Sequence, residues 1–169
     1  MPHNAPIILT ATMGAADFAW ADALRRAHFP PERNQVPAHI TLFHHLPPSV
    51  EPELLGYMAS LCKEAAPEAH VSGVLHLGNG VAFRVNSPAL EALRYGLAEA
   101  FHGLLIPQDR ATPRFHITVQ NKVSTDEART LLTALQAGFR ARPLMISGLA
   151  AWRYMGGPWE PIRAMRFRG

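Results

Sequence analysis

The chain has 169 residues and a mass of 18.6 kDa, with 48% hydrophobic residues, 17% charged residues and a net charge of +3. This length suits one domain spanning residues 1–169, and this composition excludes disordered and collagen-like chains. No apolar run approaches the roughly 20 residues of a membrane span, no secretory signal is recognisable, and the single cysteine, Cys62, cannot form an internal disulfide. We therefore expect a soluble protein of the cytoplasm.

The first third of the chain is predicted to contain two strands and two helices. Residues 7–13 are apolar and β-rich, and Asp17 is the expected N-cap of a helix that reaches His28. Residues 39–46 form the second predicted strand. The helix that follows carries its apolar residues at helical spacing, which places Cys62 in the core. This apolar set is Leu54, Leu55, Met58, Leu61, Cys62 and Ala65.

The middle of the chain predicts a hairpin and a long helix. Residues 71–77 and 81–85 flank the turn at residues 78–80, which reads Gly-Asn-Gly and tolerates positive φ angles. Ser87 is the expected N-cap of the helix, and Pro88 suits its first position. We expect this helix to end near Pro107.

The last third repeats the order of strand, helix and hairpin. Residues 115–123 form the predicted strand, and Ser124 with Glu127 makes a capping box for a helix that ends near Gly138. Residues 144–154 and 159–167 flank a second hairpin turn. From residue 39 onward the same unit therefore occurs twice.

Both units begin with the same tripeptide, as His39-Ile40-Thr41 and as His116-Ile117-Thr118, 77 residues apart. Because side chains alternate along a strand, we expect His39, Thr41, Phe43 and His45 on one face of the first strand. In the second strand the shared face carries Arg114, His116, Thr118 and Gln120. A pseudo-twofold axis would bring two histidines and two threonines to one cleft. A looser match at residues 70–72, His-Val-Ser, lies outside the repeat and is interpreted as structural.

Paired imidazoles and hydroxyls indicate a particular chemistry. Imidazoles with pKa values near 6.5 can act as base and acid at neutral pH, and hydroxyls can donate to anionic oxygens. One His-x-Thr is more often structural, but two identical copies in a repeated context favour a functional role. This set suits displacement at a phosphate diester, of which a cyclic phosphate attacked by water is the simplest case.

Other residues are candidates for binding a substrate, beginning with Phe43 and Gln120 on the faces of the two histidines. Arg114 and Arg153 could contact a phosphate, and Trp152, Tyr154 or Trp159 could stack on a base, with core packing as the alternative for these aromatic residues. His39, His44 and His45 lie close in sequence, but alternation separates His44 from the other two, and no carboxylate or thiol follows at ligand spacing. We expect neither a metal site nor a cofactor.

With these two motifs the chain resembles the 2H phosphoesterases, and in particular their bacterial 2'-5' RNA ligase-like (LigT-like) branch. The resemblance implies an α+β, bilobal, pseudo-twofold fold in which two mainly antiparallel sheets line a central cleft and helices pack outside. It implies metal-independent opening of cyclic phosphates on a nucleotide or RNA end. It also implies that His39 and His116 are the acid/base pair and that Thr41 and Thr118 hold phosphate oxygens. By similarity to mechanisms proposed for family hydrolases, His116 activates the water and His39 protonates the leaving oxygen.

The first motif departs from the family pattern. Relatives often continue with phenylalanine, leucine and glycine, whereas this chain continues with Phe43, His44, His45 and Leu46. His45 is therefore a candidate phosphate contact, with a strand-end residue as the alternative. Two further functions remain open, namely RNA 2'-5' ligation or cleavage at the same site and a module that binds nucleotides or RNA ends without turnover. We expect no obligate protein partner and a monomer.

Overall fold

The computed structural model describes residues 4–168, which form an α+β fold. The strands are β1 (Ile7–Met13), β2 (Ile40–Leu46), β3 (Glu68–His76), β4 (Val81–Asn86), β5 (His116–Gln120), β6 (Arg142–Arg153) and β7 (Glu160–Arg166). The α-helices are α1 (Ala15–His28), α2 (Glu51–Leu61), α3 (Pro88–Ala100), α4 (Pro107–Arg110) and α5 (Thr125–Ala137). Two 3₁₀ turns, η1 (Pro31–Arg33) and η2 (Pro48–Val50), precede β2 and α2. Among the helices of residues 4–168, none combines the length and apolar character needed to cross a bilayer.

All strand pairs are antiparallel, and the strands follow the order β2-β1-β6-β3-β4-β5, with β7 paired to β6. The long strand β6 joins the two halves. Its residues 142–145 pair with β3, and its residues 146–153 pair with β1. The two sheets expected from the resemblance are therefore two halves of one continuous antiparallel sheet.

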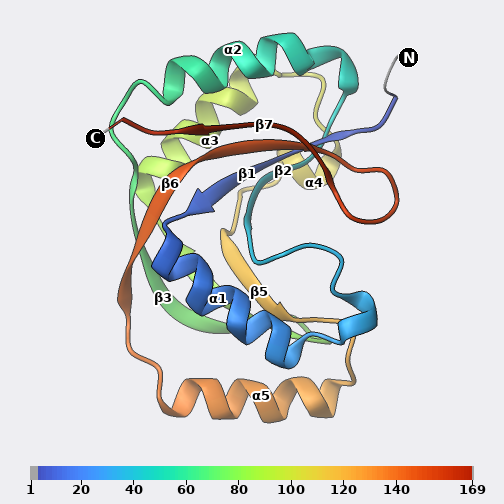
Figure 1. Ribbon diagram of the computed structural model, residues 1–169, viewed down its shortest axis with the longest axis vertical. Helices are drawn as coiled ribbons and strands as arrows, with labels where there is room; N and C mark the ends of the chain where they lie inside the picture. Colours follow the sequence, from blue (N-terminus) through green and yellow to red (C-terminus); the bar gives the residue numbers. More distant parts are fainter. Residues whose placement is uncertain (1–3, 169) are drawn as a thin grey trace.

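The strand order has an internal symmetry. Read from its two ends, β2-β1-β6 corresponds to β5-β4-β3, so the unit β1-α1-β2-α2-β3 is matched by β4-α3-β5-α5-β6. The sheet curls, and its edge strands β2 and β5 come close together without pairing (Figure 1). The two strands that begin at the repeated tripeptides therefore face each other across an open edge.

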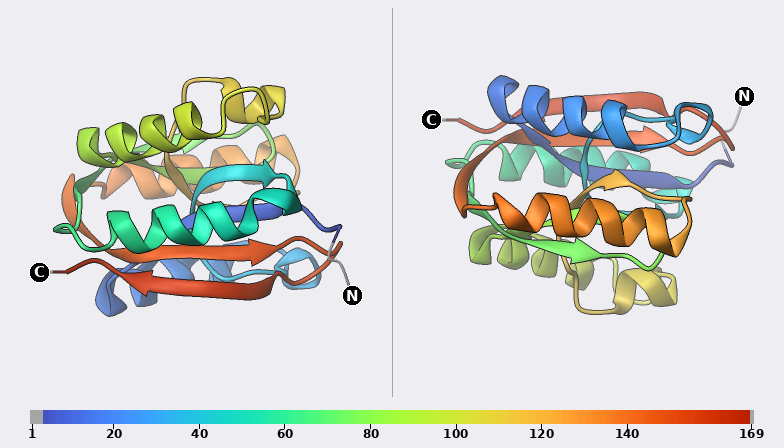
Figure 2. Two further views of the ribbon diagram at one scale, coloured as in Figure 1. Left: turned by 90° about the horizontal axis from the view of Figure 1, so that it is seen from above. Right: turned by 90° about the horizontal axis from the view of Figure 1, so that it is seen from below.

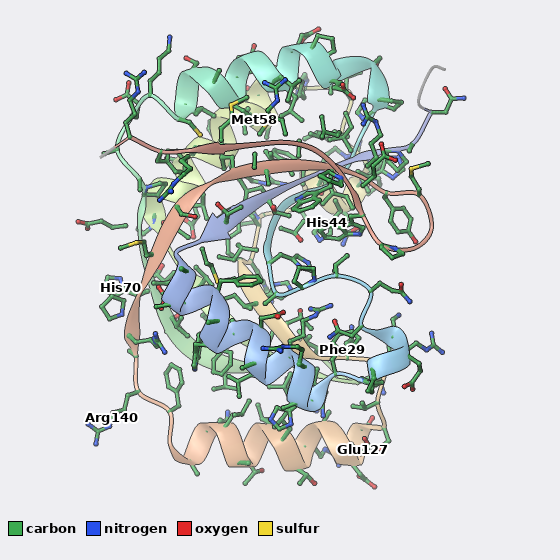
Figure 3. All side chains as sticks on the ribbon, in the orientation of Figure 1. Phe29, His44, Met58, His70, Glu127 and Arg140 are labelled. Atoms are coloured by element: carbon green, nitrogen blue, oxygen red, sulfur yellow. The ribbon has the colours of Figure 1, made fainter. Side chains whose placement is uncertain are left out.

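The helices cover both sides and both ends of this sheet. Helix α1 packs on β5 and β1, α3 on β3, and α5 on β3 and β4. In Figure 1, α2 and α5 lie at opposite ends, and Figure 2 shows α1 and α3 on opposite sides of the molecule. The core between these layers includes Leu9, Phe43 and Ile117 from the sheet and Met58 from α2, all fully buried. Figure 3 labels Met58 below α2, on the side of the helix that faces the sheet.

Several sequence predictions of local structure are confirmed. The Ser87 and Ser124 hydroxyls accept hydrogen bonds from the N–H groups of Leu90 and Glu127, as expected of N-caps. Cys62 is buried at the end of α2. The caps were predictable because the serine side chain competes for backbone N–H groups that a helix start leaves free.

Other local predictions were wrong. Helix α1 is capped by Gly14, and the Asp17 carboxylate instead accepts hydrogen bonds from the Arg142 guanidinium and the Met145 N–H. The predicted long helix ends at Ala100 rather than near Pro107. Helix α2 ends at Leu61, which leaves Ala65 exposed.

Candidate active site

The first histidine lies at the entrance to an edge strand. His39 directly precedes β2 and is half-buried, and its neighbour Ile40 is fully buried in the core. The His39 Nδ1–H donates to the Pro37 carbonyl over 2.8 Å. The Ala38 N–H donates to the Asp22 carboxylate over 2.9 Å, which fixes the backbone before the ring to α1.

The second histidine is held in the same way. His116 begins β5, is half-buried, and donates from Nδ1 to the Arg114 carbonyl over 2.7 Å. In both motifs the acceptor is therefore the carbonyl two residues upstream. Because a carbonyl can only accept, each neutral ring carries its proton on Nδ1 and leaves the Nε2 lone pair available to take a proton. Arg114 contributes this carbonyl, and its own side chain is exposed.

Both motif strands contain one extra residue just after the threonine. Thr41 pairs with Thr10, but Phe43 pairs with Leu9, so β2 advances by two residues while β1 advances by one. The additional residue is Leu42. Such a bulge reverses the face on which the following side chains lie.

The same irregularity occurs in the other half. Thr118 pairs with Ala82, but Gln120 pairs with Val81, so Val119 is the additional residue of β5. The two half-buried threonines stay on the face of their histidines by the alternation of the strand. The residue four positions after each histidine is moved to the other face.

The expectation that Phe43 and Gln120 share the face of the histidines is therefore wrong, because alternation does not continue through a bulge. Phe43 is fully buried, with the Arg94 guanidinium 4.3 Å above its ring, and has no surface from which to contact a ligand. Gln120 is 6% exposed, and its Oε1 has no hydrogen-bond partner within residues 4–168.

The surroundings of the His39 ring disfavour its protonated form. Burial, opposed by the hydrogen bond to the Pro37 carbonyl, lowers the pKa of His39 to about 4. Positive charge on Arg25, His116 and His44 acts in the same direction as burial. His116 is thus close enough for its charge to affect the protonation of His39.

A cavity of about 430 Å³ adjoins the His39 ring. Trp159 lies against this ring at 4.7 Å between centroids, and Trp152 lies 6.1 Å from Trp159. The Trp152 Nε1–H already donates to the Thr10 hydroxyl. The lining side chains from the described part of the chain otherwise include Phe18 and Met13 but no charged residue apart from a protonated His39, so the cavity suits a neutral flat group. Tyr154 is 47% exposed and is not part of the lining.

The end of β2 is fastened by Asp109 of α4, which is fully buried. Its carboxylate accepts hydrogen bonds from the His44 and His45 N–H groups, each at 2.9 Å, and from the His44 Nδ1–H at 3.2 Å. Figure 3 labels His44 near this junction. The His45 side chain is exposed.

Nowhere in residues 4–168 do three or more His, Cys, Asp or Glu side chains gather in a way that could hold a metal ion.

Two buried arginines were missed by the sequence interpretation. Arg25 of α1 donates to the Thr118 carbonyl over 2.9 Å, and Arg94 of α3 donates to the Leu42 carbonyl over 3.0 Å. The two residues lie in corresponding helices, and each reaches a motif strand of the other half. Arg25 follows the buried Ala21 by four residues, so an arginine on the inward face of an amphipathic helix was the available signal. Arg153, the other candidate phosphate contact, instead pairs with Glu51 and Glu160.

Comparison with solved structures shows the same fold. TT0787 of Thermus thermophilus is 15% identical, with a TM-score of 0.62 over 97% of this chain and 98% of the other. E. coli LigT complexed with ATP is 16% identical, with a TM-score of 0.57 over 98% of each chain. E. coli LigT complexed with NADP+ is 17% identical, with a TM-score of 0.57 over 99% of each chain.

Sequence comparison identifies the family. No curated protein sequence matches the chain. The model of the 2'-5' RNA ligase superfamily matches residues 14–158, which include both His-x-Thr tripeptides. The chain therefore belongs to the 2'-5' RNA ligase superfamily.

Proposed function

We propose that this protein is a phosphoesterase that opens cyclic phosphates of nucleotides or RNA ends without a metal ion. The observation that carries this proposal is the matched pair of imidazoles. Each histidine lies at the start of an edge strand, donates from Nδ1 to the carbonyl two residues upstream, and keeps Nε2 free. One ring can then accept a proton while the other donates one, which is the requirement for hydrolysing a cyclic diester.

The lowered pKa of His39 favours a role opposite to the one that the family resemblance implied. A group with a pKa of about 4 is neutral at pH 7 in about 999 of 1,000 molecules, which suits a base and not an acid. We therefore assign His39 to take a proton from water through Nε2. The water oxygen attacks phosphorus and the bond from phosphorus to one ribose oxygen breaks. His116, which enters this step protonated on both ring nitrogens, donates its Nε2 proton to that oxygen. The product is a phosphate monoester.

The remaining site residues are assigned by position. Thr41 and Thr118 lie two residues after the histidines and are half-buried, so we assign their hydroxyls to the phosphate oxygens. We assign the cavity beside His39 to the base of a nucleotide, with Trp159 as its wall. The complexes of E. coli LigT with ATP, 3'-AMP and NADP+ support a nucleotide as the ligand class.

Hydrolysis of 2',3'-cyclic nucleotides in the presence of a chelator tests the proposal. We expect turnover by the unaltered protein and a loss of at least about 100-fold in the His39→Ala and His116→Ala variants. A His70→Ala variant is the matched control, since His70 is an exposed residue of β3. Full activity in either motif variant would reject the assignment.

Two other activities would give different results in related assays. Joining of RNA 2',3'-cyclic and 5'-hydroxyl ends would identify a ligase in which a ribose hydroxyl replaces water. Binding of cyclic nucleotides with no hydrolysis across all bases would identify a binding module. We place the enzyme in the cytoplasm as a monomer, and sedimentation velocity tests the oligomeric state.

A further inference from the structure

Arg25 is a buried cation at the junction of the two motifs. Its side chain comes from α1 and the residue is 5% exposed. Nη1 donates to the Thr118 carbonyl over 2.9 Å, Nε donates to the Asn34 carboxamide oxygen over 2.8 Å, and the guanidinium lies 4.3 Å from the centre of the Phe29 ring. Figure 3 labels Phe29 at the end of α1, beside β5. These contacts hold the guanidinium in one position.

No carboxylate in residues 4–168 forms an ion pair with Arg25. Its nearest acidic neighbour in the helix, Asp22, is already bonded to the Ala38 N–H and to Arg26. Burial lowers the pKa of Arg25 to about 10 and the Asp22 carboxylate acts in the opposite direction, so the side chain is still charged at neutral pH. A buried charge that no carboxylate contacts directly is costly, and an anion bound beside it would offset part of that cost.

The corresponding arginine of the other half is held in a similar way. Arg94 reaches β2 as Arg25 reaches β5, and its guanidinium also donates to the Asp109 carbonyl. Each arginine lies in the field of one carboxylate, Asp22 for Arg25 and Asp109 for Arg94, which opposes the effect of burial on its pKa. The two halves differ in that the charge of Arg25 acts on a motif histidine, His39.

This charge reaches the proposed site from the side of α1. One turn of this helix bonds both motifs, through Asp22 to the residue before His39 and through Arg25 to the backbone of Thr118. Arg25 also acts electrostatically on His39, together with His116 and His44. The cation is thus fixed against β5 and acts on the histidine that precedes β2.

We propose that Arg25 is a positioning residue whose buried charge compensates the phosphate anion held between the two motifs, while its hydrogen bond to Thr118 fixes the second motif against α1. The proposal rests on the proposed function for the identity of the anion. It adds a residue outside the His-x-Thr tripeptides on which anion binding depends. It also accounts for the low pKa of His39 in part, because a nearby cation disfavours the protonated ring.

Three variants distinguish the effect of the Arg25 charge from the effect of its hydrogen-bonding geometry. Arg25→Gln removes the charge, Arg25→Lys keeps the charge without the planar fork, and Arg26→Gln removes one charge from the next residue, whose side chain is 69% exposed. Inorganic phosphate is the probe, and its dissociation constant is measured by NMR from the ring signals of His39 and His116. The pKa of His39 is measured from the same signals. Thermal unfolding of each variant shows that it is folded.

The expected results differ between the variants. Arg25→Gln should weaken phosphate binding at least about 10-fold and raise the pKa of His39, whereas Arg26→Gln should change binding less than about 2-fold. Arg25→Lys should keep the low pKa of His39 and recover part of the binding. The proposal is overturned if Arg25→Gln behaves like Arg26→Gln in a folded protein, or if phosphate does not bind the unaltered protein. Phosphate binding that depends on Arg25 in a protein that hydrolyses no cyclic phosphate would instead reject the proposed hydrolysis and leave this inference standing.

Discussion

The assignment of His39 as the base predicts an unusual pH dependence. Burial and the charges of Arg25, His116 and His44 hold the pKa of His39 at about 4. Protonation inactivates a base, so activity should be lost only as the pH falls through this low value. At pH 5 a base with a pKa of about 4 is about 90% neutral, whereas an ordinary histidine with a pKa of about 6.5 is about 3% neutral.

The rate at pH 5 should therefore be about 30-fold higher than an unshifted histidine would allow. The assay measures kcat/KM for hydrolysis of a 2',3'-cyclic nucleotide between pH 4 and pH 9 in the presence of a chelator. This ratio reports the pKa values of the essential groups in the free enzyme. We expect no fall between pH 7 and pH 5. The matched variant Arg25→Gln should move the acidic limb to higher pH, and Arg26→Gln should leave it in place. An acidic limb with its midpoint near 6.5 in the unaltered protein would refute this reasoning.

Three other residues give separate tests. Asp109→Ala leaves the N–H groups at the end of β2 without their acceptor and should lower the free energy of unfolding in urea by about 2–4 kcal/mol; a loss below about 0.5 kcal/mol would contradict the role of this carboxylate. Phe43→Ala should lower the free energy of unfolding by about 3–5 kcal/mol, while KM of the folded protein stays unchanged. A rise in KM would show that Phe43 contacts the substrate after all. Trp159→Ala should raise KM for cyclic nucleotides about 10-fold, and Tyr154→Ala, at an exposed residue, is the control. A KM of Trp159→Ala equal to that of the unaltered protein would show that the base does not bind in the cavity beside His39.

The order of elements and the motif strands could be predicted from the sequence. Apolar periodicity, Gly-containing turns and serine caps depend on neighbouring residues, so they are readable locally. The symmetry of the sheet could be predicted only in part. The sequence repeat starts at residue 39, whereas the structural repeat starts one strand and one helix earlier, at β1, because β6 pairs with both β1 and β3.

The residues around the histidines were harder to predict. Leu42 and Val119 look like ordinary strand residues, and only the pairing with β1 and β4 shows that they are extra. Strand alternation therefore assigned Phe43 and Gln120 to the wrong face. The inward position of Arg25 on α1 was the available local signal. Its partners, Thr118 and Asn34, are brought to α1 by tertiary packing, so its contacts could not be predicted from the sequence.

The central claim is that the two imidazoles act on one phosphorus atom. A crystal structure with inorganic phosphate tests this claim most directly. We expect one phosphate between β2 and β5, with the Nε2 atoms of His39 and His116 both within about 3 Å of its oxygens. A phosphate that contacts only one of the two rings, or rings that cannot reach the same anion, would contradict the account.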